Sequence, residues 1–175
     1  ESSSNWHKYL LVILIFIAIG TLVYLFVKNY QKKKIEQITF KTPIEKAREA
    51  HADDAAFQAG LNTRSQVMGA EYVDRALGAA TDFTMPMQEF ITANAWGNVW
   101  QRPGLDLKTR SLITVAMLTA QGKHQELKAH VRGALTNGAS PEEIRELMLH
   151  ATVYCGFPTA IDAFRTAAEV IEGQK

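Results

Sequence analysis

The pattern of apolar and polar positions divides the chain into two unlike parts. Residues 9–27, YLLVILIFIAIGTLVYLFV, are nineteen uncharged and almost wholly apolar residues. As a helix that rises about 1.5 Å per residue, this run nearly spans the ~30 Å hydrocarbon core of a bilayer. We therefore predict a transmembrane helix that anchors the protein in a membrane.

The flanks of this run indicate a retained anchor and its orientation. Four lysines follow the run within KNYQKKK, residues 28–34, whereas Lys8 is the only lysine before it. A cleaved signal peptide carries positive charge before its apolar run and small residues after it, so the pattern favours an anchor. Because the more positive flank stays inside, we expect a single-pass membrane protein. Its C-terminal part lies on the cytoplasmic side, or on the matrix or stromal side in an organelle.

The rest of the chain follows the helical period. From Pro43 onward apolar residues recur every three to four positions, and no period-two alternation lasts longer than a few residues. The predicted fold class is therefore all-α. The expected helices cover residues 43–58, 63–79, 85–98, 106–121, 123–136, 141–154 and 158–172. The predicted organisation is a transmembrane anchor (1–30), a basic linker (31–45) and a helical domain (46–175).

Three C-terminal segments carry apolar stripes at core spacing. The stripe residues are Leu127, Val131, Ala134 and Leu135 in the first, Ile144, Leu147, Met148, Ala151 and Cys155 in the second, and Ile161, Phe164, Ala168 and Ile171 in the third. The preceding segment, residues 107–122, is apolar nearly all round, which predicts a helix enclosed by others. In NAWGNVWQ, residues 94–101, we expect Trp96 or Trp100 in the core or at a contact between subunits.

Polar residues that could carry chemistry lie beside these stripes. Glu126 and His130, at i and i+4, share one edge of their helix, and His150 and Tyr154 form a second such pair. His124 precedes the first pair by two residues. A histidine at the edge of an apolar stripe is more often a hydrogen-bonded structural residue, so spacing alone leaves catalysis and structure open.

Three arginines are candidates for binding a carboxylate. Arg110 lies inside the apolar segment, where its guanidinium needs a carboxylate of the protein or of a ligand as acceptor. Arg102 and Arg132 could bind a carboxylate with two parallel hydrogen bonds, although an arginine at the surface is usually solvated.

Charge and cysteine content exclude several classes of function. Nineteen Lys and Arg residues against eighteen Asp and Glu residues leave a net charge of +1, so no nucleic-acid partner is expected. The single cysteine, Cys155, excludes an intrachain disulfide and a cysteine-based zinc site. Glu126 and His130 would supply only two metal ligands, so no metal is expected either.

The ordered motifs together resemble one enzyme family. RSLITVAMLTAQGKHQELKAHVRGALTNGASPEEIRELMLHATVYCGFPTAIDAF, residues 110–164, closely resembles the carboxymuconolactone decarboxylase family. GAEYVDRAL (69–77) and FITANAWGNVWQRPGLDLKTR (90–110) fit the family's entry helices. The resemblance covers roughly residues 60–172, about two-thirds of the chain. It implies an alkylhydroperoxidase-like helical domain and a homo-oligomer, either a hexamer or a trimer.

One branch of this family is an alkylhydroperoxidase, which uses a C-x-x-C-x-x-x-H motif and a glutamate on the preceding helix for thiol redox chemistry. Aligned through His130, this chain has Lys123 and Glu126 at the two cysteine positions and Ser111 at the glutamate position. Without a second thiol near the first, disulfide exchange cannot proceed within the chain. Peroxidase activity is therefore disfavoured.

The decarboxylase branch, which this sequence resembles, converts 4-carboxymuconolactone to the enol-lactone of 3-oxoadipate with release of CO2 and without a cofactor. The resemblance thus implies a carboxy-lyase whose partner is a small anionic lactone, and the apolar run of residues 9–27 would anchor this enzyme in a membrane. Loss of the carboxylate leaves an anion that needs a donor at the lactone oxygen and an acid for the neighbouring carbon. We expect His130 as general acid or oxyanion donor, Glu126 to set its protonation, and Arg110 to clamp the retained carboxylate. His150 and Tyr154 are further candidate donors.

The anchor leaves two alternatives open. Enzymes of soluble aromatic catabolism have no evident need of a membrane helix. The domain could instead be a non-catalytic, decarboxylase-like subunit of a membrane protein complex. The chain could also be an engineered or composite fusion, for which the contrast between the Lys- and Ile-rich linker and the Ala- and Gly-rich domain is the only support.

Overall fold

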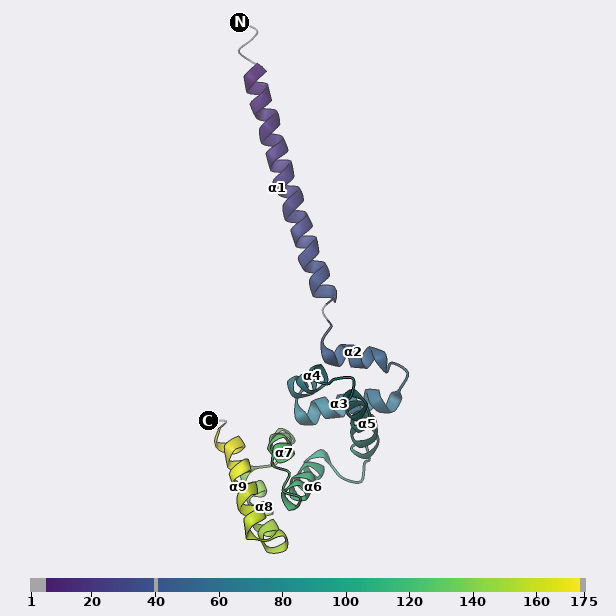
Figure 1. The fold of residues 1–175 in the computed structure, drawn as a ribbon, viewed down its shortest axis with the longest axis vertical. Coiled ribbons are helices and arrows are strands. Elements are labelled where there is room, and N and C mark those ends of the chain that lie inside the picture. The colour runs from purple at the N-terminus through teal and green to yellow at the C-terminus, as the bar shows by residue number, and fades with distance from the viewer. Residues whose placement is uncertain (1–5, 40, 174–175) are drawn as a thin grey trace. The chain divides into compact units, whose positions relative to one another are not determined.

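The computed structural model of the chain describes residues 6–39 and 41–173, and it confirms the all-α prediction, because those residues form helices and no strand. The chain divides into two compact units, Glu1–Lys41 and Thr42–Lys175. The first holds one long helix, and the second holds all the shorter ones (Figure 1).

The long helix α1 (Trp6–Thr39) contains the predicted apolar run. Among the described residues it is the one helix long and apolar enough to cross a membrane, with a candidate span of Trp6–Ile35 and a mean hydropathy of 3.0. None of this span is buried against protein. The helix continues past the apolar run to Thr39, because lysine, glutamate and glutamine are good helix formers. Its orientation across a membrane stays a prediction.

The first helices of the second unit differ from the predicted ones. Where one helix was expected over 43–58 and another over 63–79, there are three: α2 (Pro43–Ala50), α3 (Ala55–Met68) and α4 (Ala70–Gly78). Asp54 accepts a hydrogen bond from the backbone N–H of Phe57 (2.9 Å) and so starts a new helix. Gly69 has a φ of +89°, a conformation that ends α3 and that side chains rarely adopt.

The next segment is a π-helix, which the sequence did not predict. The short α5 (Met85–Phe90) continues directly into η1 (Ile91–Val99). Its backbone lies against that of α3: a Cβ added to Gly60 would lie 1.9 Å from the carbonyl oxygen of Thr92, and one added to Gly97 would lie 2.0 Å from that of Ala56. Only glycine permits this approach, so α3 and η1 form a closely packed pair.

The last four helices are α6 (Leu107–Ala120), α7 (His124–Thr136), α8 (Pro141–Cys155) and α9 (Phe157–Glu172). Each end lies within one residue of its predicted position. Asp106 caps α6, and Ser140 with Glu143 forms the capping box of α8. These local capping residues mark in the sequence where the two helices begin. Their shared core contains Val115, Leu127, Val131, Ala134, Ala139, Ile144, Met148, Ala163, Ala167 and Val170.

Two predicted core faces need correction. On α9 the fully buried residues are small ones, Ala160, Ala163, Ala167 and Val170, whereas Ile161 is 46% exposed. The alanines let α9 lie close to its neighbours, so the larger residues flank the contact rather than form it. On α6 the expected enclosure is incomplete within one chain, because Ile113 is 38% and Met117 58% exposed.

The second unit has two groups of helices with separate cores (Figure 1). Phe57, Leu61, Val73 and Leu77 form the smaller core, among α2 to α5, and α6 to α9 surround the larger one. α7 packs on α6, α9 and α3. A Cβ on Gly133 would lie 3.2 Å from the carbonyl oxygen of Val67, so α7 meets α3 closely and connects the two groups.

Candidate active site

The helix α7 presents different residues on its two faces. It begins after Gly122, whose φ of +63° reverses the chain at the end of α6. The predicted stripe residues Leu127, Val131 and Ala134 are fully buried, which confirms the core face. The opposite face carries polar side chains toward a cleft, so α7 connects the core to the candidate site.

The cleft lies between α4, α7 and α9 and encloses about 640 Å³. Its lining residues are Tyr72, His124, Gln125, Glu126, Lys128, Ala129, Arg132, Thr166 and Glu169. His124, Lys128 and Arg132 follow one another at i, i+4 and i+8 and form a basic stripe along α7. A cleft of this size with a basic wall suits a small anion.

The charges in this cleft are only partly compensated. Lys128 Nζ lies 2.7 Å from Glu169 Oε2 and holds the pKa of that carboxyl below its ordinary value. Thr166 Oγ1 lies 3.4 Å from His124 Nδ1. Among the described residues no carboxylate pairs with Arg132, so its positive charge is available to a ligand.

The structure separates Glu126 and His130 more than their spacing suggested. Glu126 is exposed and lines the cleft, whereas His130 is half-buried and is not among the residues that line it. The imidazole lies parallel to the Trp96 ring, with an interplanar angle of 2° and 6.3 Å between centroids. Burial lowers the pKa of His130 below its ordinary value of 6.5, and the Glu126 charge opposes that effect. His130 is therefore mostly a neutral imidazole at pH 7.

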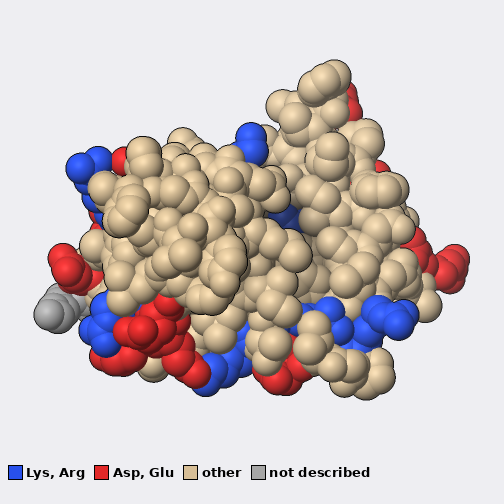
Figure 2. Space-filling view, turned by 90° about the horizontal axis from the view of Figure 1, so that it is seen from below, with Lys and Arg blue, Asp and Glu red and all other residues tan. Residues whose placement is uncertain are grey.

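The pair on α8 lies in a different hollow. The rings of His150 and Tyr154 are 4.7 Å apart, tilted by 39°, and line a hollow of about 490 Å³ with Leu147 and Cys155. Tyr154 is 76% exposed. Figure 2 looks at the domain from the side of the α8–α9 turn and shows a broad face with few charged side chains. One chain therefore does not bring His150 and Tyr154 to Glu126, and their role as donors stays a prediction.

Arg110 has acceptors of a kind that the sequence reasoning did not consider. Its Nη2 donates to the carbonyl oxygen of Arg102 (2.8 Å), and its Nε donates to that of Leu105 (3.2 Å). These bonds tie the loop before α6 to the helix and occupy two of the five guanidinium donors. The expected carboxylate acceptor is thus replaced by main-chain carbonyls, and carboxylate clamping by Arg110 stays a prediction.

Two residues of interest were missed by the sequence reasoning. Tyr72 of α4 lines the cleft. Arg64 of α3 is 6% exposed. The signal for Arg64 was present, because it follows Phe57 and Leu61 at helical spacing and so falls on the buried stripe of its helix.

Among residues 6–39 and 41–173, no three His, Cys, Asp or Glu side chains are grouped so that they could hold a metal ion. Ser111, at the position of the hydroperoxidase glutamate, is buried and accepts a hydrogen bond from Asn137 Nδ2 (2.9 Å). Cys155 lies in the α8 hollow, away from the α7 cleft.

Comparison with known proteins identifies the family. The family described as the carboxymuconolactone decarboxylase family matches residues 86–169. The nitrosuccinic acid decarboxylase of Metarhizium robertsii is 51% identical over 115 residues, which cover 66% of this chain and 80% of that protein. The 4-carboxymuconolactone decarboxylase of Acinetobacter baylyi is 42% identical over 120 residues, 69% of this chain and 90% of that protein. The chain therefore belongs to the carboxymuconolactone decarboxylase family.

Proposed function

We propose that the protein is a cofactor-independent carboxy-lyase that removes CO2 from a small dicarboxylic acid at the α7 cleft. Both relatives are named as decarboxylases, and the compounds in their names, nitrosuccinic acid and 4-carboxymuconolactone, each carry two carboxyl groups. The observation that carries the proposal is a cleft with the basic stripe of α7 as its wall, together with the neutral His130 on the same helix. We take 4-carboxymuconolactone as the first substrate to test.

The basic stripe accounts for substrate attraction. Arg132 and Lys128 face a cleft that water can enter, and positive groups on such a wall raise the local concentration of a dianion. A cation held against the departing carboxylate would stabilise the ground state and slow the reaction. The leaving carboxylate must therefore lie away from these cations, toward His130 and the apolar surface of Trp96.

His130 then acts on the charge that develops. The bond between the ring carbon and the carboxylate breaks, CO2 leaves, and the electron pair moves through the conjugated double bond to the lactone carbonyl oxygen. A neutral imidazole N–H can donate a hydrogen bond to that oxygen, and partial burial strengthens the interaction. The carbon next to the carbonyl takes up a proton that reaches the cleft from solvent through Glu126, which is exposed and one turn away from His130.

The helix α1 adds a tether to this enzyme. Its length and composition suit a single membrane span, and the lysines after the apolar run favour a cytoplasmic, matrix or stromal location for the lyase domain. The uncovered apolar residues of α6 and α8 fit the expected homo-oligomer. The tether and the oligomer are both parts of the proposal.

The test is turnover by the full chain in a mild detergent. 4-Carboxymuconolactone is supplied, and its loss and the release of CO2 are followed together, with nitrosuccinate as a second substrate. The proposal predicts equal amounts of substrate lost and CO2 released. A helical, well-folded protein that turns over neither compound would contradict it and would favour the non-catalytic subunit of a membrane complex.

A further inference from the structure

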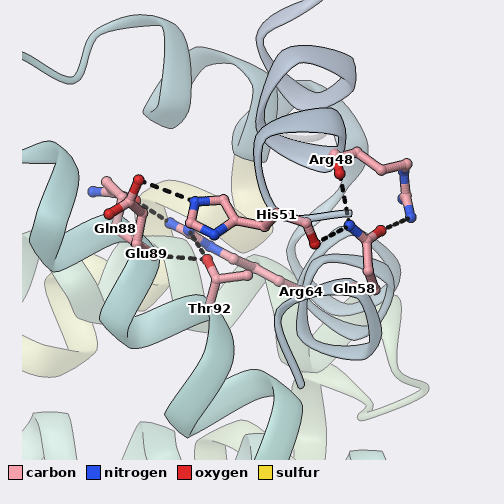
Figure 3. A network of polar contacts seen from close by, with 7 residues as sticks. All are labelled: Arg48, His51, Gln58, Arg64, Gln88, Glu89 and Thr92. Atoms are coloured by element: carbon pink, nitrogen blue, oxygen red, sulfur yellow. Dashed lines mark hydrogen bonds and ion pairs between the residues drawn. The ribbon is translucent and has the colours of Figure 1, made fainter. Parts of the chain in front are cut away.

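A buried guanidinium in α3 is hydrogen-bonded to two neutral side chains. Arg64 is 6% exposed and lies between α3 and the α5–η1 segment (Figure 3). Its Nη1 donates to Thr92 Oγ1 at 3.0 Å, and its Nη2 donates to Gln88 Oε1 at 2.7 Å. Both acceptors are neutral, and among the described residues no carboxylate pairs with Arg64.

The acid next to Gln88 in the chain is already engaged elsewhere. Glu89 follows Gln88 directly, but its Oε1 lies 3.1 Å from His51 Nε2 (Figure 3). The His51 ring is in turn held by stacking on Phe57, with 4.1 Å between centroids. This arrangement leaves the Arg64 guanidinium to the amide of Gln88 and the hydroxyl of Thr92.

Such a charge is energetically unfavourable without an anion. Burial lowers the pKa of Arg64, although Tyr72 opposes the effect, and arginine stays protonated even so. Buried charges in proteins are normally paired, because desolvation is only offset by an opposite charge and hydrogen bonds. Two of the five donors of Arg64 are used, which leaves three for a further acceptor.

The position of Arg64 relates it to the α7 cleft by two routes. Tyr72, which is near enough to Arg64 to oppose the lowering of its pKa, also lines the cleft. Thr92, the hydrogen-bond partner of Arg64, lies about one turn along η1 from Trp96, the ring that stacks on His130. Arg64 and His130 thus lie against neighbouring turns of the same π-helix.

We propose that Arg64 is the anchor that binds the retained carboxylate of the dicarboxylic substrate, a role that rests on the proposed function. Gln88 and Thr92 fix the plane of the guanidinium so that its free edge can form two parallel hydrogen bonds to a carboxylate. The substrate brings the missing negative charge. The basic stripe of α7 attracts the substrate, and Arg64 sets which carboxylate is kept.

Binding of an unreactive dicarboxylate tests this role separately from turnover. The full chain in a mild detergent is titrated with succinate by calorimetry, and its unfolding temperature is measured with and without succinate. For Arg64→Gln we expect the succinate Kd to rise about 10- to 100-fold, as for a lost hydrogen-bonded charge. The succinate Kd of Arg64→Lys should lie between that of the wild type and that of Arg64→Gln. Arg75→Gln is the matched control, because Arg75 is exposed on α4 and should leave Kd within about twofold.

Stability distinguishes an anchor from a structural arginine. An anchor without its anion destabilises the empty protein, so Arg64→Gln should unfold at the same temperature as the wild type or at a higher one. The anchor role is overturned if Arg64→Gln and Arg64→Met both unfold well below the wild type, or if Arg64→Gln binds succinate as the wild type does. Absence of succinate binding to the wild type also overturns it. Arg64-dependent succinate binding without turnover of 4-carboxymuconolactone keeps the anchor and removes the lyase assignment.

Discussion

On α7 and on α8 a histidine lies four residues from a second polar side chain, and the two pairs look alike in the sequence. Their surroundings differ. His130 is half-buried, lies parallel to Trp96 and has a pKa lowered by burial, and its partner Glu126 faces a cleft with a basic wall. His150 is exposed beside Tyr154, which is 76% exposed, above a mainly apolar hollow. The i, i+4 spacing therefore describes a face of a helix but not its environment.

The cause of the difference lies in what supports each helix. α7 packs on α3, α6 and α9, and the π-helix η1 holds Trp96 against His130. α8 packs on α6 and α9, and its outer residues Val153 and Tyr154 meet no other part of the described chain closely enough to be buried. Burial lowers the pKa of a histidine only where other elements enclose its ring, as they do for His130.

The largest expected effect comes from breaking the support behind His130. Gly60→Ala places a Cβ 1.9 Å from the Thr92 carbonyl oxygen, so α3 and η1 must separate. We expect a loss of about 3 kcal/mol or more in the free energy of unfolding. Gly104→Ala is the control, because nothing lies within 4 Å of its added Cβ. Denaturant unfolding of the full chain in detergent measures both, and equal stability of the two variants would refute the close α3–η1 contact.

A smaller effect, on kcat, is expected when one carboxylate is replaced in each of the two hollows. Glu126 lines the α7 cleft and Glu146 lines the α8 hollow. Glu126→Gln should lower kcat for 4-carboxymuconolactone about tenfold or more, since it removes the proposed route of the proton. Glu146→Gln should leave kcat unchanged. Steady-state kinetics at pH 7 measures kcat for both variants. A lower kcat in Glu146→Gln than in Glu126→Gln would indicate that the active site lies at α8.

The pH dependence of stability sharpens the comparison further. The unfolded chain binds a proton at His130 near its ordinary pKa of 6.5, whereas burial lowers the pKa in the folded state. Between the pKa of the folded state and that of the unfolded state, the unfolded chain binds more protons than the folded one. The contribution of His130 to stability is therefore complete above about pH 6.5 and is lost as the pH falls through the folded-state pKa. Unfolding temperatures from pH 7.5 to pH 5 should show this fall in the wild type and a weaker one in His130→Asn. The same slope in both would mean that His130 is not buried as described.

The smallest effect is expected on the outer face of α8. Tyr154→Ser should change the free energy of unfolding by less than about 0.5 kcal/mol in a protein kept dilute enough to be monomeric, because the ring is mostly exposed. Thermal unfolding as a function of protein concentration measures this. A large loss that grows with concentration would show that a second copy covers Tyr154.

The sequence predicted the C-terminal helices well because their boundaries are encoded locally. Asp106, Ser140 and Glu143 are caps that act within one turn, and Gly122 and Gly138 adopt the positive φ that ends a helix. The N-terminal helices were predicted less well, since Asp54 and Gly69 divide a pattern that still looks periodic. The π-helix depends on glycine contacts between distant segments, which no local pattern reveals.

The candidate site could be predicted only in part, because local spacing identifies candidate residues but contacts between distant segments determine their surroundings. Helical spacing identified Glu126 and His130, but only packing shows that one faces the cleft and the other turns toward Trp96. Arg110 looked like the buried arginine because its segment is apolar, yet backbone carbonyls of its own loop accept its hydrogen bonds. Arg64 is the more buried guanidinium, and its hydrogen-bond partners Gln88 and Thr92 lie on another helical segment, far from it in the sequence.

The central claim is that the α7 side of the domain, and not the α8 side, carries out a decarboxylation. The most direct measurement compares kcat/KM for 4-carboxymuconolactone in the full chain, His130→Ala and His150→Ala, each checked for helical content. We predict that His130→Ala loses about 100-fold or more, as expected for removal of an oxyanion donor, while His150→Ala stays within about threefold. Equal losses in the two variants, or full activity in His130→Ala, would contradict this assignment.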